Sequence, residues 1–423
     1  MLERLTQRWM EWIWGPGLLL LVFGVGLWMT VGSGFYPLRK AGKIFGRFFR
    51  GKKKGGFAAA MTSLGATVGT GNIVGVASAI AMGGAGAVFW MWVGAFFGMM
   101  LKFAEASLSI RCRNEKGGGA PLYIRKAFGG KGVAAFWCVC CVLASFGGGN
   151  AVQVSAAAKA AETAFPKAAL WVGISIAVLT GLVFLGKAKT VTKVSSVLVP
   201  VMAGFYLLGV AFVLWRFREA VPEAFFSIFR EAFGKRAAAG GIGGWLTSET
   251  LRVGIARGTF THEAGMGSAS LAHAESDETD PETQGDWGIL EVFLDTMVVC
   301  TATALVLLVT GKAGTEEAFS LGFGTIGTVF LIAALFLFAL AAVLGWEFYG
   351  EKALSFLTEK KAAKVIYRLL FLTVSVGSSV SQSAVLWNLS DCFNGLMIFP
   401  NLMALFLLRK EVFDFIKKKK ALG

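Results

Sequence analysis

The chain has 423 residues, of which 55% are hydrophobic and only 16% are charged, and its formal net charge is +15. Soluble proteins carry about 25% charged residues, so this composition excludes an ordinary soluble protein. The positive charge does not indicate nucleic-acid binding, because the Lys and Arg residues gather in short loops between long apolar blocks. That pattern is typical of cytoplasmic loops in membrane proteins.

The apolar blocks match the ~20 residues that a helix needs to cross a bilayer. Backbone inside a bilayer must satisfy its own hydrogen bonds, so these blocks are predicted to be helices. The ~10-residue alternating segments of a transmembrane barrel do not occur in the sequence. We therefore expect an all-α membrane protein with about eleven transmembrane helices, at residues 14–31, 57–82, 86–110, 133–158, 168–186, 192–215, 243–274, 287–311, 325–350, 365–383 and 385–409.

The first block, residues 14–31, could be a signal peptide or a retained helix. We favour a retained helix because a basic run follows it and resists translocation; its residues are Arg39, Lys40, Lys43, Arg47, Arg50, Lys52, Lys53 and Lys54. The N-terminus then lies outside, and the basic C-terminal tail lies in the cytoplasm. The predicted cytoplasmic loop 275–278 is acidic, but acidic residues count little in this rule.

These features divide the chain into four segments. An accessory transmembrane helix and its basic cytoplasmic loop occupy residues 1–56, and a first set of five helices occupies residues 57–216. Residues 217–242 are charged and aromatic, which predicts an amphipathic helix on the outer face. A second set of five helices and the basic tail occupy residues 243–423.

Two spans carry a polar, glycine-rich interruption, at residues 65–75 and 258–268. Such a composition makes a poor helix interior, and irregular backbone at membrane depth occurs only where it lines a cavity or is buried in protein. The interruptions lie five spans apart. We therefore expect two discontinuous helices that open five-plus-five inverted repeats, as in secondary transporters. Close helix packing is the alternative for membrane glycines, and we favour it for Gly94 and Gly98.

Motifs of soluble chemistry do not continue in this sequence. Gly69-Thr70-Gly71 fails as GxGxxG because position 74 is Val, and His262-Glu263 fails as HExxH because position 266 is Met. No nucleophile and base are paired, so we expect a protein that is not an enzyme and that needs no metal or other cofactor. The six cysteines include no CxxC pair and are interpreted as buried thiols.

Polar side chains inside the spans are candidates for function. Glu263 and Asp295 lie well within their spans, where ionisable groups are costly and suggest a functional site. Asn150 and Gln153 follow three consecutive glycines on the fourth span. They either face the site or form hydrogen bonds between helices, and Gln153 and Glu263 are substrate-binding candidates.

Other ionisable residues have a simpler interpretation. Lys102 and Glu105 lie three residues apart on one helix face and can pair with each other. Glu291, Glu347 and Asp391 lie near the predicted ends of their spans, where water can solvate them.

With these motifs the chain resembles the alanine/glycine:cation symporter family. The matching stretches are GTGNIVGV at 69–76, GGAGAVFWMW at 83–92, KFAE at 102–105, ARG at 256–258, EAGMGS at 263–268, LEVFLDT at 290–296, LGW at 344–346 and PNL at 400–402. They follow one another over nearly the whole chain, which makes the resemblance specific. It implies eleven helices, with LeuT-like five-plus-five inverted repeats after the first, and uptake of alanine, glycine or similar amino acids driven by sodium or protons.

The resemblance also implies a substrate site and cation ligands. It places the substrate carboxylate on the amides of Thr70, Gly71 and Asn72, at a half-helix N-terminus that favours anions. Trp346 matches a pocket residue that limits the size of the substrate side chain. By similarity with related sodium symporters, the candidate cation ligands are Gly65, Thr67, Val68, Asn72, Asp295 and Ala342.

The chain departs from the family at two places. Family members usually carry a Ser-Thr or Thr-Thr pair before Leu-Gly-Trp, whereas this chain has Ala341-Ala342 and lacks two hydroxyl ligands for a hard cation. His262 replaces the usual Asn before Glu-Ala-Gly. Histidine carries protons near neutral pH, so His262 and Glu263 are candidate proton carriers.

The expected function is symport of small neutral amino acids with sodium. Proton-coupled symport of the same substrates and a passive amino-acid channel or uniporter stay open as alternatives. The expected partners are a small amino acid, the coupling cation and the lipid bilayer, without nucleic acid. We expect the protein in the cell membrane of a prokaryote.

Loop charge leads to a topology test. A cysteine at position 53 should be shielded from an impermeant thiol reagent added outside intact cells, whereas a cysteine at position 163 should react. The reason is that position 53 lies in the basic run and position 163 lies three loops later, on the opposite side. Labelling is compared with the unmodified protein and with permeabilised cells, and the reverse pattern would contradict the inverted repeat.

Overall fold

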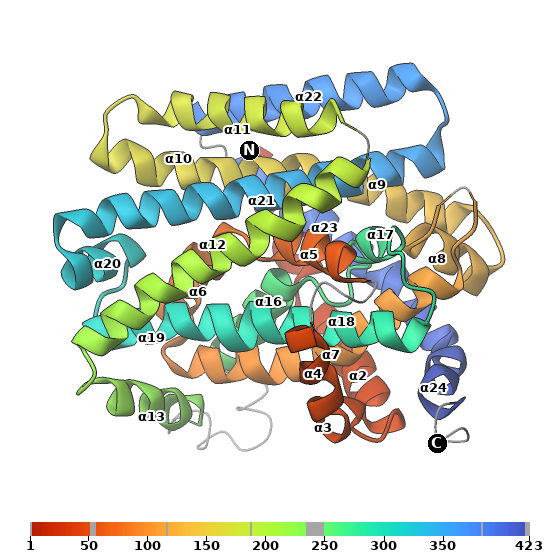
Figure 1. Cartoon of the computed structure of the whole chain (residues 1–423), viewed down its shortest axis with the longest axis horizontal. Helices are drawn as coiled ribbons and strands as arrows, with labels where there is room; N and C mark the ends of the chain where they lie inside the picture. Colours follow the sequence, from red (N-terminus) through yellow and green to blue (C-terminus); the bar gives the residue numbers. More distant parts are fainter. Residues whose placement is uncertain are drawn as a thin grey trace.

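The computed structural model describes residues 2–50, 56–115, 117–186, 188–233, 249–381 and 384–418. Every named element in these residues is a helix, as the sequence predicts. Figure 1 shows the long helices running broadly in one direction, with short helices α8 and α24 at one end and α13 and α20 at the other. The N-terminal half contains α1 (Leu2–Ile13), α2 (Pro16–Gly32), α3 (Tyr36–Arg39), α4 (Ala41–Arg50), α5 (Phe57–Thr67), η2 (Thr70–Asn72), α6 (Val74–Gly83), α7 (Gly86–Arg111), α8 (Ala120–Phe128), α9 (Gly132–Phe146), η3 (Gly147–Ala151), α10 (Val152–Ala164) and α11 (Ala168–Phe184).

The C-terminal half repeats the pattern of long helices joined by short ones. Two short segments, η3 and η4, are π-helical turns inside longer helices. The elements of this half are α12 (Ala188–Arg216), α13 (Val221–Ala232), α16 (Glu249–His262), α17 (Ser270–His273), α18 (Pro281–Val292), η4 (Phe293–Cys300), α19 (Thr301–Thr310), α20 (Thr315–Phe323), α21 (Thr325–Leu357), α22 (Lys361–Val380), α23 (Ala384–Leu407) and α24 (Arg409–Lys418).

Among the described residues, eight helical segments are long and apolar enough to cross a membrane. The bent pair Phe57–Thr67 and Thr70–Gly83 makes a ninth, and these nine fall on nine of the predicted spans. The predicted span 168–186 corresponds to the apolar helix α11, which has 17 residues. The predicted span 243–274 begins outside the described residues and continues as α16 and α17. The total of eleven therefore stays a prediction.

The N-terminal helices pack against the rest of the bundle. Helix α2 coincides with the predicted first span and lies against α7, while α1, which the sequence did not reveal, lies against α23. The indole Nε1 of Trp14 donates to the carbonyl of Asp391 at 2.8 Å, and Asn388 Nδ2 donates to Thr6 Oγ1 at 3.3 Å. These contacts attach the accessory segment to the last long helix.

The predicted amphipathic segment contains a helix, α13, while residues 234–242 lie outside the described residues. The location of α13 on the outer face stays a prediction. Its inner face packs on α7 and buries Ala224, Ser227, Ile228 and Ala232, at the spacing of one helical face. Its outer face exposes the rings of Phe225, Phe226 and Phe229.

Helices α7 and α21 form the centre of the protein. Every residue from Gly98 to Ile110 on α7 is buried, and so is every residue from Phe338 to Gly350 on α21. Small residues allow these helices to approach their neighbours closely. A side chain on Gly98 would lie 2.9 Å from the His262 ring of α16, and the nearest atom of Ile255 would lie 3.8 Å from one on Gly94. The packing role predicted for these two glycines is consistent with both contacts.

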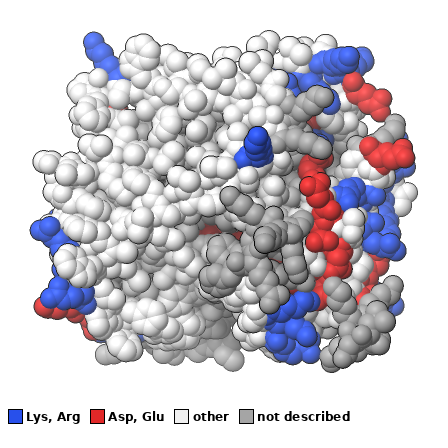
Figure 2. Space-filling view, in the orientation of Figure 1, with Lys and Arg blue, Asp and Glu red and all other residues white. Residues whose placement is uncertain are grey.

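Charged side chains gather at the ends of the bundle. On the face shown in Figure 2, the middle of the molecule is mostly uncharged, whereas Lys, Arg, Asp and Glu lie mainly toward the edge that carries α8 and α24, with a smaller group at the opposite edge. An uncharged belt between two charged ends is the surface expected of a protein that spans a bilayer.

The contact between α21 and α5 leaves no room for a methyl group. A Cβ on Gly345 would lie 2.4 Å from the Cβ of Ala66, so Gly345→Ala should overpack the core and cost about 1–3 kcal/mol of stability. Gly377→Ala on α22 is the matched control, because nothing lies within 4 Å of that position. In detergent, Gly345→Ala should lower the thermal unfolding temperature and Gly377→Ala should not. Equal unfolding temperatures would contradict the packing.

Candidate functional site

The first predicted interruption is a broken helix. Helix α5 ends at Thr67, and the helical segment that starts at Thr70 is bent from it by 62°. The amide of Gly69 donates to Asn72 Oδ1 at 3.1 Å, so the Asn72 side chain caps the new helix start. The break therefore replaces lost helical hydrogen bonds with side-chain contacts, as a membrane interior requires.

Gln153 on α10 holds the same break from the opposite side. Its Oε1 accepts the amide of Thr70 at 2.9 Å and the Thr70 hydroxyl at 2.8 Å. Its Nε2 donates to the carbonyl of Gly148 at 3.0 Å. The amide of Asn72 donates to Gly69 at 3.1 Å, whereas that of Gly71 makes no hydrogen bond among the described residues. Of the three amides expected to bind an anion, Gly71 is the one available in this conformation.

The second predicted interruption, 258–268, is non-helical from residue 263, at residues 263–269 between α16 and α17, whereas residues 258–262 still belong to α16. Glu263, Gly265 and Gly267 have φ angles of 52°, 94° and 84°. Glycine adopts such angles readily, whereas they are uncommon for a residue with a side chain. The glycines explain how the chain reverses here, and Glu263 must be held in place by its surroundings.

Two buried residues of α7 hold the second break. Lys102 Nζ donates to the carbonyl of His262, at the C-terminal end of α16, at 3.0 Å. Glu105 Oε1 accepts the amides of Gly265 and Gly267, each at 2.9 Å. A cation thus lies at a helix C-terminus and an anion at free amides, which is the favourable arrangement for both. The ion pair that the sequence suggested between Lys102 and Glu105 is not observed, because each side chain binds the backbone of the break instead.

Glu263 is fixed by both of its carboxylate oxygens. Trp346 Nε1 donates to Oε1 at 3.1 Å, and Ser268 Oγ donates to Oε2 at 2.7 Å. Trp346 packs directly on the backbone of the fourth span, since a Cβ on Gly149 would lie 2.2 Å from its ring. The orientation of the indole is therefore set jointly by Glu263 and by the absence of a side chain at position 149.

The two breaks meet at a small cavity of about 20 Å³. Space of this size holds about one water molecule, so an amino acid cannot enter without a rearrangement of the lining. Four of the six predicted substrate-binding residues, Gly71, Gln153, Glu263 and Trp346, line it, while Thr70 and Asn72 lie in the adjoining turn. The full lining is Ala66, Thr67, Gly71, Gly148, Gln153, Phe260, Thr261, Glu263, Met266, Trp346 and Asn394.

Asp295 and Asn72, two predicted cation ligands, are in direct contact. Asn72 Nδ2 donates to Asp295 Oδ1 at 2.7 Å, and Thr296 Oγ1 donates to Asp295 Oδ2 at 2.8 Å. The carbonyl of Asn72 accepts the Thr303 hydroxyl at 2.8 Å. All of these side chains are buried. Thr67, predicted with them, bonds its hydroxyl within α5, to the carbonyls of Ser63 and Leu64.

The end of α5 lies against Ala341 and Ala342 of α21. A Cβ on Gly65 would lie 3.8 Å from Ala341 Cβ, and one on Gly69 would lie 3.3 Å from Ala342 Cβ. The chain therefore brings α21 next to the break, where the backbone from Gly65 through Val68 to Gly69 passes. The methyl groups of Ala341 and Ala342 lie beside this backbone.

His262 is buried behind the second break. Its Nδ1 accepts the amide of Ala264 at 3.0 Å, so this nitrogen carries no proton. The side-chain oxygen of an Asn at position 262 could accept the same amide. His and Asn at this position both offer an acceptor two residues before the donor, Ala264. The histidine thus makes the local turn contact that an Asn would make.

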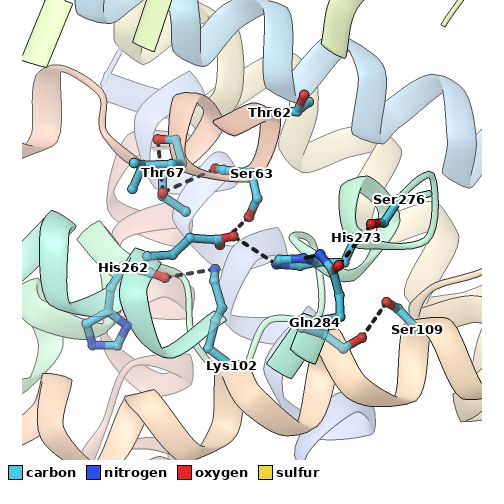
Figure 3. A network of polar contacts seen from close by, with 12 residues as sticks. Thr62, Ser63, Thr67, Lys102, Ser109, His262, His273, Ser276 and Gln284 are labelled. Atoms are coloured by element: carbon cyan, nitrogen blue, oxygen red, sulfur yellow. Dashed lines mark hydrogen bonds and ion pairs between the residues drawn. The ribbon is translucent and has the colours of Figure 1, made fainter. Parts of the chain in front are cut away.

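A second polar network joins α5, α17 and α18 beside the site. Ser63 Oγ donates to Glu291 Oε2 at 2.6 Å, and His273 Nε2 lies 3.0 Å from Glu291 Oε1. Gln284 contacts His273 through its Nε2 and accepts the Ser276 hydroxyl through its Oε1. Figure 3 shows the labelled members of this network together with Lys102 and His262.

The expectation that water solvates Glu291 and Glu347 is wrong. Both side chains are buried, with 1% of their surface exposed. Glu347 faces Arg368, whose Nε lies 3.7 Å away. The α18 and α21 helices extend beyond the predicted span ends, and neighbouring helices cover these positions. Asp391 is partly exposed, in line with the prediction.

Sequence reasoning missed Asn394, which lines the cavity from α23. It also left the role of Asn150 open: this side chain bonds to Phe371 and Ser375 of α22 and so joins two helices. The signal for Asn394 was available, since a polar side chain inside a predicted span requires a partner. The cysteines follow the prediction, because five of the six are buried and none is in a disulfide within the described residues.

Comparisons with known proteins agree over almost the whole chain. A model of the sodium:alanine symporter family matches residues 1–421. An uncharacterized transporter of Haemophilus influenzae is 38% identical over 96% of this chain and 93% of its own. The sodium/alanine symporter AgcS of Methanococcus maripaludis is 36% identical, with 97% of each chain covered. The probable sodium/glutamine symporter GlnT of Bacillus subtilis is 34% identical over 97% of this chain and 90% of its own.

A solved structure shares the fold. The crystal structure of a variant of the manganese transporter of Eremococcus coleocola matches 84% of this chain and 76% of its own with a TM-score of 0.51. The sequence identity is 14%, so the match concerns the arrangement of helices alone.

The Glu105 contacts predict a stability effect at the second break. Glu105→Leu leaves the amides of Gly265 and Gly267 and the Asn401 amide without their shared acceptor, and each unsatisfied buried donor costs about 1–3 kcal/mol. Glu105→Gln is the matched control, because its amide oxygen can still accept. Thermal unfolding in detergent should be lowered clearly more by Leu than by Gln. The same loss in both variants would mean that the charge, not the acceptor, matters.

Proposed function

Because the chain belongs to the sodium:alanine symporter family, we propose that it is a secondary active transporter that takes small neutral amino acids, alanine and glycine foremost, into the cell together with sodium. Its family is one of transporters of amino acids with cations, and its apolar helices fit a multi-pass membrane protein. The observation that carries the proposal is the meeting of two broken helices at one buried cavity, since substrate and ion sites of such transporters lie at paired broken helices.

The proposed carboxylate site is the amide of Gly71 and its neighbours at the start of α6. A helix N-terminus presents free amides and a positive dipole end to an anion. The Thr70 amide and hydroxyl now bind Gln153, so we propose that Gln153 turns toward the substrate when it enters. Trp346, held by Glu263, would close the side-chain end of the pocket and limit substrate size.

The proposed sodium site lies at the C-terminal end of α5. The carbonyls of Gly65 and Val68 are the proposed ligands, Ala341 and Ala342 lie beside this end of the helix, and a helix C-terminus attracts a cation. Two hydroxyl ligands are missing there, so affinity for sodium should be weak. Asn72, Asp295 and Thr67 are proposed to form a second cation site.

The position of His262 supports sodium over protons as the coupling ion. Its Nδ1 accepts the amide of Ala264, and a proton on this nitrogen would break that contact. Its role then matches that of the family's Asn, and the substitution needs no change of coupling ion. Proton coupling through Glu263 and passive flux stay the alternatives, and measurement of alanine uptake separates both from sodium coupling.

The proposed architecture is an accessory helix followed by two five-helix repeats in opposite orientation. The breaks open the first and the second set of helices, at α5 and at α16, and the helix arrangement resembles that of the manganese transporter. Loop charge supports an outer N-terminus and a cytoplasmic C-terminus in the cell membrane of a prokaryote.

Uptake of radiolabelled alanine into proteoliposomes tests the proposal. With an inward sodium gradient alanine should accumulate above its outside concentration, and alaninamide, which lacks the carboxylate, should not compete. A proton gradient alone should not drive accumulation. Alanine flux that only equilibrates would indicate a passive channel, and accumulation driven by protons and lost in His262→Asn would indicate proton coupling.

The alanine pair predicts a gain of function. Ala342→Thr adds a hydroxyl ligand beside the proposed sodium site, so it should lower the sodium concentration that gives half-maximal uptake, by roughly tenfold if one hydrogen-bond-sized contact is gained. Ala353→Thr on the same helix is the control for a new hydroxyl away from the break. An unchanged or raised sodium requirement in Ala342→Thr would place the ion elsewhere.

A further inference from the structure

One polar side chain of the cavity lining, that of Asn394, has an oxygen without a hydrogen-bond partner among the described residues. Asn394 is buried, with 2% of its surface exposed, and its Oδ1 has no hydrogen-bond partner among the described residues. The other polar side chains of the lining are engaged, as shown by Gln153 with Thr70, Glu263 with Trp346, and Thr261 with the carbonyl of Gly258. A buried amide without a partner is costly, so a partner is expected to arrive with a ligand.

Ser390 extends the same polar face of α23. It lies one helical turn before Asn394 and is 2% exposed, and its hydroxyl also has no partner among the described residues. A Cβ on Gly148 would lie 2.8 Å from both Asn394 Nδ2 and Ser390 Oγ. These two groups therefore occupy the position that a side chain at residue 148 would take, packed against the fourth span.

The position of Asn394 relates it to the substrate side chain. The proposed carboxylate and cation sites lie at helix ends, on α6 and α5. Asn394 instead faces η3, where Gly148 contacts Asn394 and the adjoining Gly149 contacts Trp346. Asn394 and Trp346 thus lie against adjacent residues of one helical segment, and Trp346 is the residue proposed to close the side-chain pocket.

We infer that Asn394, which lines the cavity, forms a polar subsite that binds a hydroxyl or amide group on the side chain of the substrate, with Ser390 next to it outside the lining. Beside alanine and glycine, the substrate class then includes small amino acids with a hydrogen-bonding side chain, among them L-serine. An amide both donates and accepts, so it matches a hydroxyl or a carboxamide equally. The inference rests on the proposed function, since it concerns the same substrate site.

The test compares two amino acids of nearly the same shape. L-serine and L-2-aminobutyrate differ by a hydroxyl in place of a methyl group, and each competes with radiolabelled alanine for uptake into proteoliposomes. A polar subsite should make serine the better competitor by roughly tenfold, because aminobutyrate leaves the buried amide without a partner. In Asn394→Leu and in Asn394→Ala the inhibition constant of aminobutyrate divided by that of serine should fall to about one or below.

Asn388→Leu is the matched control. Asn388 lies on the same helix but outside the cavity lining, where it bonds to Thr6, so the serine preference should persist in that variant. Equal competition by serine and aminobutyrate in the unmodified protein overturns the inference even if every variant fails to fold. It would mean that Asn394 is satisfied by a bound water. Absence of alanine uptake by the unmodified protein would instead overturn the proposed function.

Discussion

The structure depends on satisfying backbone groups where two membrane helices are interrupted. In a bilayer interior each unpaired amide or carbonyl is costly, so a helix can stop there only if side chains replace its hydrogen bonds. Asn72 and Gln153 do this at the first break, and Lys102 and Glu105 do it at the second. Because Lys102 and Glu105 belong to α7, the position of that helix determines the shape of the second break.

This constraint explains how two charged residues can lie in the fully buried part of α7. A buried ion usually destabilises a fold unless it is paired and hydrogen-bonded. Lys102 and Glu105 are 0% exposed, yet they compensate opposite partial charges at the two ends of the same interruption. The charges of one helical turn and the dipoles of the break thus stabilise each other.

Much of the fold could be predicted from the sequence, because length and hydrophobicity of a membrane helix are written in consecutive residues. Nine predicted spans coincide with apolar helices, and both interruptions fall where glycines and polar residues cluster. Partners distant in sequence could not be predicted. Lys102 and Glu105 suggested a local pair and bind α16 and its break instead, and Glu291 is covered by α5 and α17. Such contacts depend on how helices assemble, which spacing along one helix does not reveal.

The residues of the candidate site also divide into those that a local motif predicts and those that only helix packing reveals. Residues within a recognisable motif, such as Gly71 and Glu263, line the cavity as expected. Asn394 was missed because it is one of several polar residues in its span, with Asn388, Ser390 and Asp391. Only the packing of α23 against η3 shows that Asn394 reaches the cavity.

The π-helical turn at 147–151 limits which residue deletions this helix can tolerate. A π-turn accommodates one residue more than an α-helical turn. Its wider ring is closed here by the amide of Val152, which donates to the carbonyl of Gly147, while the Gln153 side chain donates to the carbonyl of Gly148. Removing one residue from 147–151 would leave an uninterrupted α-helix but rotate every later side chain by about 100°. Gln153 would then point away from Thr70. A deletion here would therefore keep the segment helical but remove Gln153 from the site. The number of residues between 147 and 151 is thus constrained as well as their identity.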